Sequence, residues 1–179
     1  MATGFEAAST NRIVELFGGS KATLFRYYPT KQLLLEGVVL RIADRWTSAV
    51  DLRSLPAAQP EQWLNGCATR MLAWILGPEP LFVGRLAIAE GHKFPKLGKD
   101  FEQRAIRPLQ AALAARLGEW HRAGLIRSVA PARDAERYLD LTFSGEVSRA
   151  LYGRPRRSAR SLARHRHECV ALFLRGLRA

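Results

Sequence analysis

The sequence predicts an all-α protein. Almost every long segment places apolar residues three or four positions apart, the period of an amphipathic helix, and the strict alternation typical of strands is nearly absent. Proline, glycine and hydroxyl residues stand between these segments, where they can start and stop helices. With 179 residues, of which 47% are hydrophobic, the chain is long enough for one sizeable core or for a small module joined to a larger one.

Two short helices are expected at the N-terminus. The first covers residues 9–17, and the second begins at Ser20 and ends near residue 28, because Pro29 disfavours helical angles in the residue before it. Gly18-Gly19 between them permits a tight turn, so the pair predicts a helix-turn-helix whose second helix can enter a major groove. A surface hairpin with a mixed polar face has the same pattern and remains an alternative.

A long helix is expected next, from Thr30 as its cap to about Val50. Its apolar residues share one face: Leu33, Leu34, Val38, Ile42 and Trp46. After a loop over 54–60, Pro60 opens a helix that runs to about Leu76. Further helices are expected over 81–92, 96–123 with a bend at Pro108, 131–151 and 158–177, separated by Gly124 and by Gly153-Arg154-Pro155.

The charge of the chain favours an acidic partner. The formal net charge is +12 and the pI is near 10.8, which suit nucleic acid or an anionic membrane surface. No apolar run approaches the roughly 18 residues of a membrane span, and the N-terminus lacks the form of a signal peptide. The sequence therefore predicts a cytoplasmic protein with no membrane partner. Eight arginines against Glu168 in residues 154–179 favour a solvated helix face over a second nucleic-acid or membrane contact.

Catalytic, metal and cofactor motifs are not found. Cys67 and Cys169 have no CxxC spacing, and His165 and His167 in RHRHEC are two apart, so they point away from each other on a helix. The sequence has no GxSxG motif and no cofactor fingerprint. We therefore expect a protein that is not an enzyme and has no catalytic residues, no metal ligands and no cofactor.

Two stretches carry a resemblance to a known family. GFEAASTNRIVELFGGSKATLFRYYPTKQLLLEGV (4–38) resembles the DNA-binding region of TetR/AcrR-family transcriptional regulators, and RLAIAEGHKFPKLGKDFEQRA (85–105) resembles the effector domain of AefR-like members. The resemblance implies a helix-turn-helix N-terminal domain, residues 1–45, followed by a helical-bundle domain for ligand binding and dimerisation, residues 46–179. It also implies double-stranded operator DNA as a partner.

Several residues are candidates for DNA contact. Ser20, Lys21, Thr23 and Arg26 carry donors suited to phosphates or base edges. By resemblance, Lys21, Ala22, Thr23 and Arg26 lie along the recognition helix, while Thr10, Tyr27 and Lys31 contact phosphates.

The chain also departs from the family pattern. Phe25 replaces a usual tyrosine and Gly19 a usual valine. Family members have a helix before Gly4-Phe5, where this sequence has only Met1-Ala2-Thr3. We expect that the true start lies upstream; a degraded DNA-binding domain is the alternative.

The resemblance implies an inducer pocket and a dimer. Large aromatic residues at helical spacing are usually core, but they also line bundle pockets. The candidates for a pocket that accepts a small apolar effector are Trp46, Trp63, Trp74, Phe82, Phe101 and Trp120. The homodimer is expected to form through helices 132–152 and 158–177. The residues expected in its seam are Leu139, Phe143, Phe173 and Leu177, and the alternative for some of them is the subunit's own core.

The predicted function is that of a ligand-responsive transcriptional regulator, a repressor released from a palindromic operator by the effector. The alternative is a TetR-like ligand-binding module with a decayed or incomplete DNA-binding domain.

Overall fold

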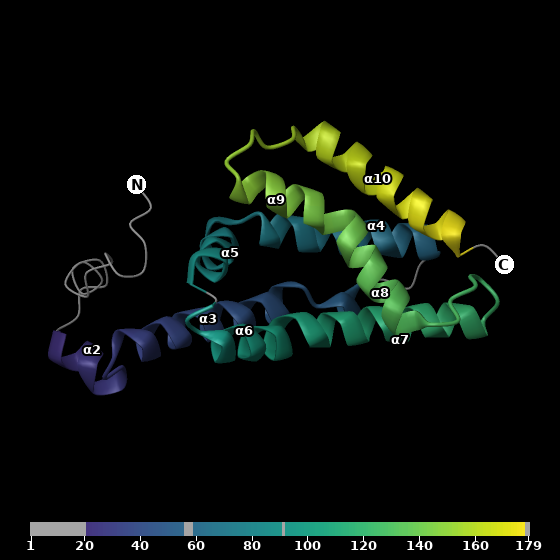
Figure 1. Ribbon diagram of the computed structural model, residues 1–179. Coiled ribbons are helices and arrows are strands. Elements are labelled where there is room, and N and C mark those ends of the chain that lie inside the picture. The colour runs from purple at the N-terminus through teal and green to yellow at the C-terminus, as the bar shows by residue number, and fades with distance from the viewer. Residues whose placement is uncertain (1–20, 56–58, 91, 178–179) are drawn as a thin grey trace.

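The computed structural model describes residues 21–55, 59–90 and 92–177, and these form helices and loops without a strand (Figure 1). The predicted all-α class is confirmed. The elements are α2 (Lys21–Tyr27), α3 (Lys31–Ala49), the 3₁₀-helix η1 (Leu52–Ser54), α4 (Pro60–Ile75), α5 (Pro78–Glu90), α6 (Pro95–Phe101), the π-helix η2 (Glu102–Ile106), α7 (Arg107–Arg122), α8 (Pro131–Leu139), the π-helix η3 (Asp140–Ser144), α9 (Gly145–Leu151) and α10 (Ala159–Gly176).

The signals for helix ends act as the sequence predicts. The hydroxyls of Thr30 and Ser158 cap α3 and α10 by accepting the backbone N–H three residues later, at 3.1 and 3.2 Å. Gly124 and Gly153 follow α7 and α9 with φ of 70° and 68°, the left-handed region that disfavours a side chain.

Three predicted helices differ from expectation, and one of them, expected over 131–151, is divided into α8, η3 and α9. The helix expected from Leu81 begins at Pro78, whose fixed φ suits a first helical turn. The helix expected over 96–123 is divided into α6, η2 and α7. The Arg107 N–H bonds to the Glu102 carbonyl five residues earlier, so the chain takes the wider π register just before Pro108.

The main core lies between α4, α7, α8 and α10. Its fully buried side chains include Leu64, Leu113, Leu117 and Val170. Such side chains each contribute about 1.5–3 kcal/mol by leaving water. Tyr138 is also fully buried, and its hydroxyl donates to the Leu64 carbonyl at 2.7 Å, which satisfies its polar atom.

The main core takes up most of the residues expected in a dimer seam. Phe143, Phe173 and Leu177 are buried within the single chain, and Leu139 packs against the same core half-buried. The first three are therefore not available to a partner helix. The reason is geometric: the apolar side chains of α8, η3 and α10 are directed toward α4 and α7 of the same chain.

A smaller core joins α3 to the rest of the molecule. Leu35, Val39 and Ile42 of α3 pack with Val83 of α5 and Leu97 of α6. In Figure 1, α3 runs alongside α6 and carries α2 at its far end, away from the bundle of α4, α8, α9 and α10. A displacement of α3 would therefore move α2.

In the part of the chain that the structure describes, no single helix is long and apolar enough to cross a membrane. Residues Pro60–Ile75 and Pro78–Ile88 together have the length and composition, but they are bent by 72° against each other.

Candidate effector cavity and DNA-facing helices

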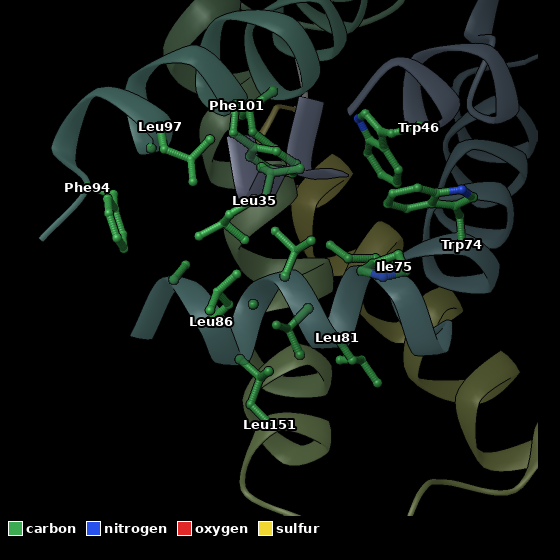
Figure 2. A pocket seen from close by; sticks show the side chains of 18 residues that line it. Leu35, Trp46, Trp74, Ile75, Leu81, Leu86, Phe94, Leu97, Phe101 and Leu151 are labelled. Atoms are coloured by element: carbon green, nitrogen blue, oxygen red, sulfur yellow. The ribbon is translucent and has the colours of Figure 1, made fainter. Parts of the chain in front are cut away.

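An apolar cavity of about 210 Å³ lies between α3, α5, α6 and α9 (Figure 2). None of the described residues that line it is charged, and among them only Trp46 and Trp74 have a polar side-chain group, the indole N–H. In Figure 2, Trp46 and Trp74 lie at one end of the cavity and Phe94 lies at the other. The residues labelled there are Leu35, Trp46, Trp74, Ile75, Leu81, Leu86, Phe94, Leu97, Phe101 and Leu151.

The six aromatic candidates for a pocket divide between three places. Trp46, Trp74 and Phe101 line the cavity. Trp63 and Trp120 do not; they pack edge to face in the main core, with ring centroids 5.5 Å apart. Phe82 is 53% exposed, although its neighbours Leu81 and Val83 on α5 line the cavity. Three of the six are thus brought together, and Phe94 joins them.

Trp46 is fixed on two sides. Its ring lies 4.6 Å from that of Trp74, centroid to centroid, and its indole Nε1 donates to the carbonyl of Ala105 in η2 at 2.9 Å. Only 2% of the residue is exposed. Since its single donor is already occupied, the Trp46 face of the cavity offers a ligand apolar contact only.

A second bond joins α3 to η2, from one residue later in α3 to one residue earlier in η2. Pro108 has no N–H, so it cannot donate to the Arg104 carbonyl four residues earlier. The hydroxyl of Thr47 lies 3.0 Å from that carbonyl oxygen and donates to it; it also lies 3.1 Å from the Ala43 carbonyl of its own helix. A side chain of α3 therefore supplies the Arg104 carbonyl with a donor that Pro108 cannot supply.

Ion pairs add to the attachment of α3. Arg45 pairs with Glu79 of α5 through both carboxylate oxygens at 2.8 Å, and Arg104 lies 3.6 Å from Asp44. All four side chains are largely exposed, so each pair contributes about 0–1 kcal/mol. Packing and the two hydrogen bonds, the buried one of Trp46 and the exposed one of Thr47, hold α3 more firmly than these charges do.

The candidate DNA-binding residues within the described ranges lie on α2 and in the first turn of α3, which we call the DNA-facing end. Arg26 and Tyr27 are exposed side by side: the Arg26 guanidinium lies 5.0 Å from the centre of the Tyr27 ring and donates to its hydroxyl at 3.3 Å. Ala22 is also exposed, and Lys31 is half-buried. Thr10 and Ser20, together with the side chains of Lys21 and Thr23, lie outside the described part of the structure.

Tyr28 sets the contact between α2 and α3. A methyl group at Gly37 would lie 2.5 Å from Cε1 of the Tyr28 ring, so only glycine leaves room for the ring where it stands. Because Tyr28 directly follows α2, this contact positions the helix that carries Arg26 and Tyr27.

Family comparisons match both parts of the chain. The model of the bacterial regulatory proteins of the tetR family matches residues 1–38, and that of the AefR-like transcriptional repressor C-terminal domain matches residues 62–178. The chain belongs to the TetR family. The resemblance predicted from the sequence is confirmed, and the protein has the fold of a DNA-binding transcriptional regulator.

Solved structures of TetR-family regulators have the same fold. A protein from Mesorhizobium loti MAFF303099 assigned to the family has a TM-score of 0.84 and 26% identity, covering 98% of this chain and 89% of that one. The flavonoid-responsive regulator FrrA has a TM-score of 0.74 and 21% identity with the same coverage. A TetR-family regulator from Pseudomonas syringae pv. tomato DC3000 has 0.75 and 16%, again over 98% and 89%. No similar protein was found among curated proteins.

TetR-family regulators bind DNA operators and form dimers. In this member the DNA-binding match ends at residue 38, inside α3, and the effector-domain match begins at residue 62, inside α4. The helix α3 runs from the first match toward the second without a break, so one rigid element joins the DNA-facing end to the wall of the cavity.

Some residues of this TetR-family site carry no sequence signal. The sequence singles out Trp46, on an apolar helix face, and Pro108, at an expected bend. Thr47 and Arg104 look like ordinary surface residues, because their contact forms only when two helices about sixty residues apart in the sequence meet. Gly37 does carry a sequence signal, because it lies inside a predicted long helix, where glycine lowers helix stability by about 1 kcal/mol relative to alanine.

The cysteines of the chain are not activated. Burial raises the pKa of the Cys67 thiol from 9.0 to about 12, and burial also raises the pKa of Cys169, helped by nearby Glu168. Raised pKa values keep both thiols protonated near neutral pH. In the described ranges no three histidine, cysteine or acidic residues are close enough to hold a metal ion.

The basic tail is partly engaged in structural contacts. Arg157 pairs with the buried carboxylate of Glu146 at 2.6 Å, and Arg156 donates to the Leu76 carbonyl at 2.9 Å. These two arginines anchor the loop between α9 and α10 to α4 and α9.

Proposed function

We propose that the protein is a ligand-responsive repressor that leaves its operator when a small, uncharged, apolar molecule occupies the cavity. The observation that carries the proposal is the position of the cavity against α3. Leu35, Val39 and Trp46, spread along α3, all line it, and the same helix begins directly after the recognition helix α2. A ligand can change DNA affinity only if it binds one position of α3 better than another.

The lining indicates the class of effector. Burying a charge in an apolar site without a partner costs several kcal/mol, and an unpaired hydroxyl costs about 1–3 kcal/mol. The cavity is lined by aliphatic and aromatic side chains, and one of its two indole donors is occupied by Ala105. FrrA is named for its response to flavonoids; the lining here favours compounds with fewer polar groups than a flavonoid.

For DNA recognition, we propose that Lys21, Ala22, Thr23 and Arg26 face the major groove and that Thr10, Ser20, Tyr27 and Lys31 contact the backbone. The exposure of Arg26 and Tyr27 at the free end of the molecule supports this assignment. Domains at 1–45 and 46–179 belong to the same proposal, with α3 shared between them.

Matched aromatic compounds test the proposal. An operator duplex is selected from a randomised library by binding to the full chain, and its affinity is measured by fluorescence anisotropy with and without each compound. Biphenyl should weaken operator binding about 5–150-fold, the usual range of allosteric coupling. Biphenyl-4-carboxylate, which has the same rings and a charge, should have no effect. A library that yields no operator would favour the ligand-binding module without DNA function.

A further inference from the structure

We infer that the two hydrogen bonds between α3 and η2 transmit cavity occupancy to the DNA-facing helices. We call this pair of contacts, Trp46 to Ala105 and Thr47 to Arg104, the α3–η2 junction. The inference rests on the proposed function and goes beyond it, because it assigns the coupling to named donors rather than to the packing of α3 in general. Trp46 and Thr47 are then positioning residues.

The first argument is that the junction has one face on the cavity. Trp46 and Ile106 line the cavity, so a molecule that enters it presses on both sides of the junction at once. The indole donates at 2.9 Å to Ala105, which directly precedes Ile106. A shift of the cavity wall in η2 is therefore passed to α3 through a directional bond, and directional bonds fix relative position more narrowly than apolar contact does.

The second argument is that the junction is not packed solid on its other side. A second hollow of about 280 Å³ is lined there by Trp46, Thr47, Ala105 and Pro108, among others. Empty space beside two elements allows them to slide against each other. On this side the two hydrogen bonds, together with the packing of Trp46 and Ala105, keep α3 and η2 in register.

The third argument is that Pro108 makes the junction possible. In the four-residue register of α7, an ordinary residue at 108 would supply an N–H to the Arg104 carbonyl. With proline there, that carbonyl accepts from Thr47 at 3.0 Å instead. The wider turn of η2 and the proline together leave two backbone carbonyls, those of Arg104 and Ala105, directed toward side chains of α3.

The test uses Trp46→Phe, which keeps a ring in the cavity wall but removes the donor, and Thr47→Val, which keeps the shape but removes the hydroxyl. Each has a matched control. Trp63→Phe removes a buried indole N–H that has no acceptor among the described residues. Ser48→Ala removes the neighbouring hydroxyl, which donates at 3.1 Å to the Asp44 carbonyl of its own helix.

The quantity measured is the coupling ratio, the factor by which saturating biphenyl weakens operator binding by the full chain. Each single variant should reduce this ratio about threefold and the double variant about tenfold, the range expected for lost hydrogen bonds. Biphenyl affinity, followed by quenching of tryptophan fluorescence, should stay within about threefold of wild type. Both controls should keep the wild-type ratio.

A double variant that binds biphenyl and keeps the wild-type ratio overturns the inference and leaves the proposed function standing. A wild-type protein whose operator affinity biphenyl does not change overturns both. If Trp46→Phe does not fold, Thr47→Val carries the test alone, because Thr47 lies at the helix surface. In a Pro108→Ala background, which restores the missing N–H, Thr47→Val should have no further effect, and an unchanged effect there contradicts the role of Pro108.

Discussion

Gly37 faces the ring of Tyr28 so closely that a single added methyl would lie 2.5 Å from it. Gly37→Ala should therefore displace Tyr28 and tilt α2, and we expect operator affinity to fall at least about tenfold, as contacts made by a misplaced helix are lost. Biphenyl affinity should not change. Gly145→Ala is the control, because a Cβ there meets nothing within 4 Å, the residue does not line the cavity, and the change should stabilise α9 by about 0.5–1 kcal/mol. Wild-type operator affinity in Gly37→Ala would show that Tyr28 does not position α2.

Arg26 and Lys31 should differ in what their loss does to DNA binding. If Arg26 reads base edges, Arg26→Ala should cost about 1–3 kcal/mol on the selected operator and less on random duplex. If Lys31 contacts phosphate, Lys31→Ala should weaken both DNAs alike and reduce the slope of log affinity against log salt by about one. Salt titrations on both duplexes measure this. Equal losses on both DNAs for both variants would contradict the recognition-helix assignment.

Cys67 should make the protein less stable in base. Its folded pKa of about 12 lies above the ordinary 9.0, so the unfolded chain loses its thiol proton first as the pH rises. The stability is fully present below pH 9 and is lost progressively as the pH rises toward 12. Between pH 8 and 10, the free energy of unfolding of wild type should fall by about 1.4 kcal/mol more than that of Cys67→Ala. Urea titrations under reducing conditions measure this, and parallel losses in the two proteins would be the contrary result.

Side-chain positions were only partly predictable from the sequence at this scale. Trp46 and Trp63 are both tryptophans on apolar helix faces, yet one lines the cavity and the other lies in the main core. Periodicity says that a residue is turned inward but not which inner space it meets. Phe82, one position from two cavity residues, points outward because α5 turns by about 100° per residue.

At the scale of elements, the sequence predicts helix starts well, because the residues that cause them act on their own turn of helix. These residues are Thr30, Pro60, Pro131 and Ser158. The division of the helix at η2 was predicted only as a bend at Pro108. The structure shows a π turn whose Arg104 carbonyl accepts from Thr47, a contact across helices that no local pattern encodes.

A larger side chain on α5 that fills the cavity should block binding of the effector. Val83→Phe adds a ring where Val83 lines the cavity, so biphenyl affinity should fall at least about tenfold, while overpacking costs about 1–3 kcal/mol of stability. Ile88→Phe on the exposed face of α5 is the control and should change neither quantity. Fluorescence titration and thermal unfolding measure the two effects. Undiminished biphenyl binding in Val83→Phe would place the ligand elsewhere.

At the scale of the whole molecule, the dimer seam needs residues that the subunit's own core leaves free. Leu172 is 53% exposed on α10, next to the buried Phe173. We expect Leu172→Glu to shift the dimer toward monomer, because a charge in an apolar seam has no partner. Light scattering at micromolar concentration measures the mass. Leu125→Glu, equally exposed in the loop after α7, is the control and should leave the dimer intact. If the Leu172→Glu variant remained a dimer, the dimer seam would not include this face of α10.

The central claim is that ligand binding in the cavity and operator binding at the DNA-facing end are thermodynamically coupled through α3. Linkage makes this testable in the reverse direction, because an effector that weakens operator binding by a given factor must itself be bound more weakly by the same factor when operator is present. The most direct measurement is therefore biphenyl affinity of the full chain with and without saturating operator duplex. We predict that operator lowers biphenyl affinity about 5–150-fold, by the factor found when biphenyl is added to the operator complex. Biphenyl bound equally well with and without operator would contradict the account.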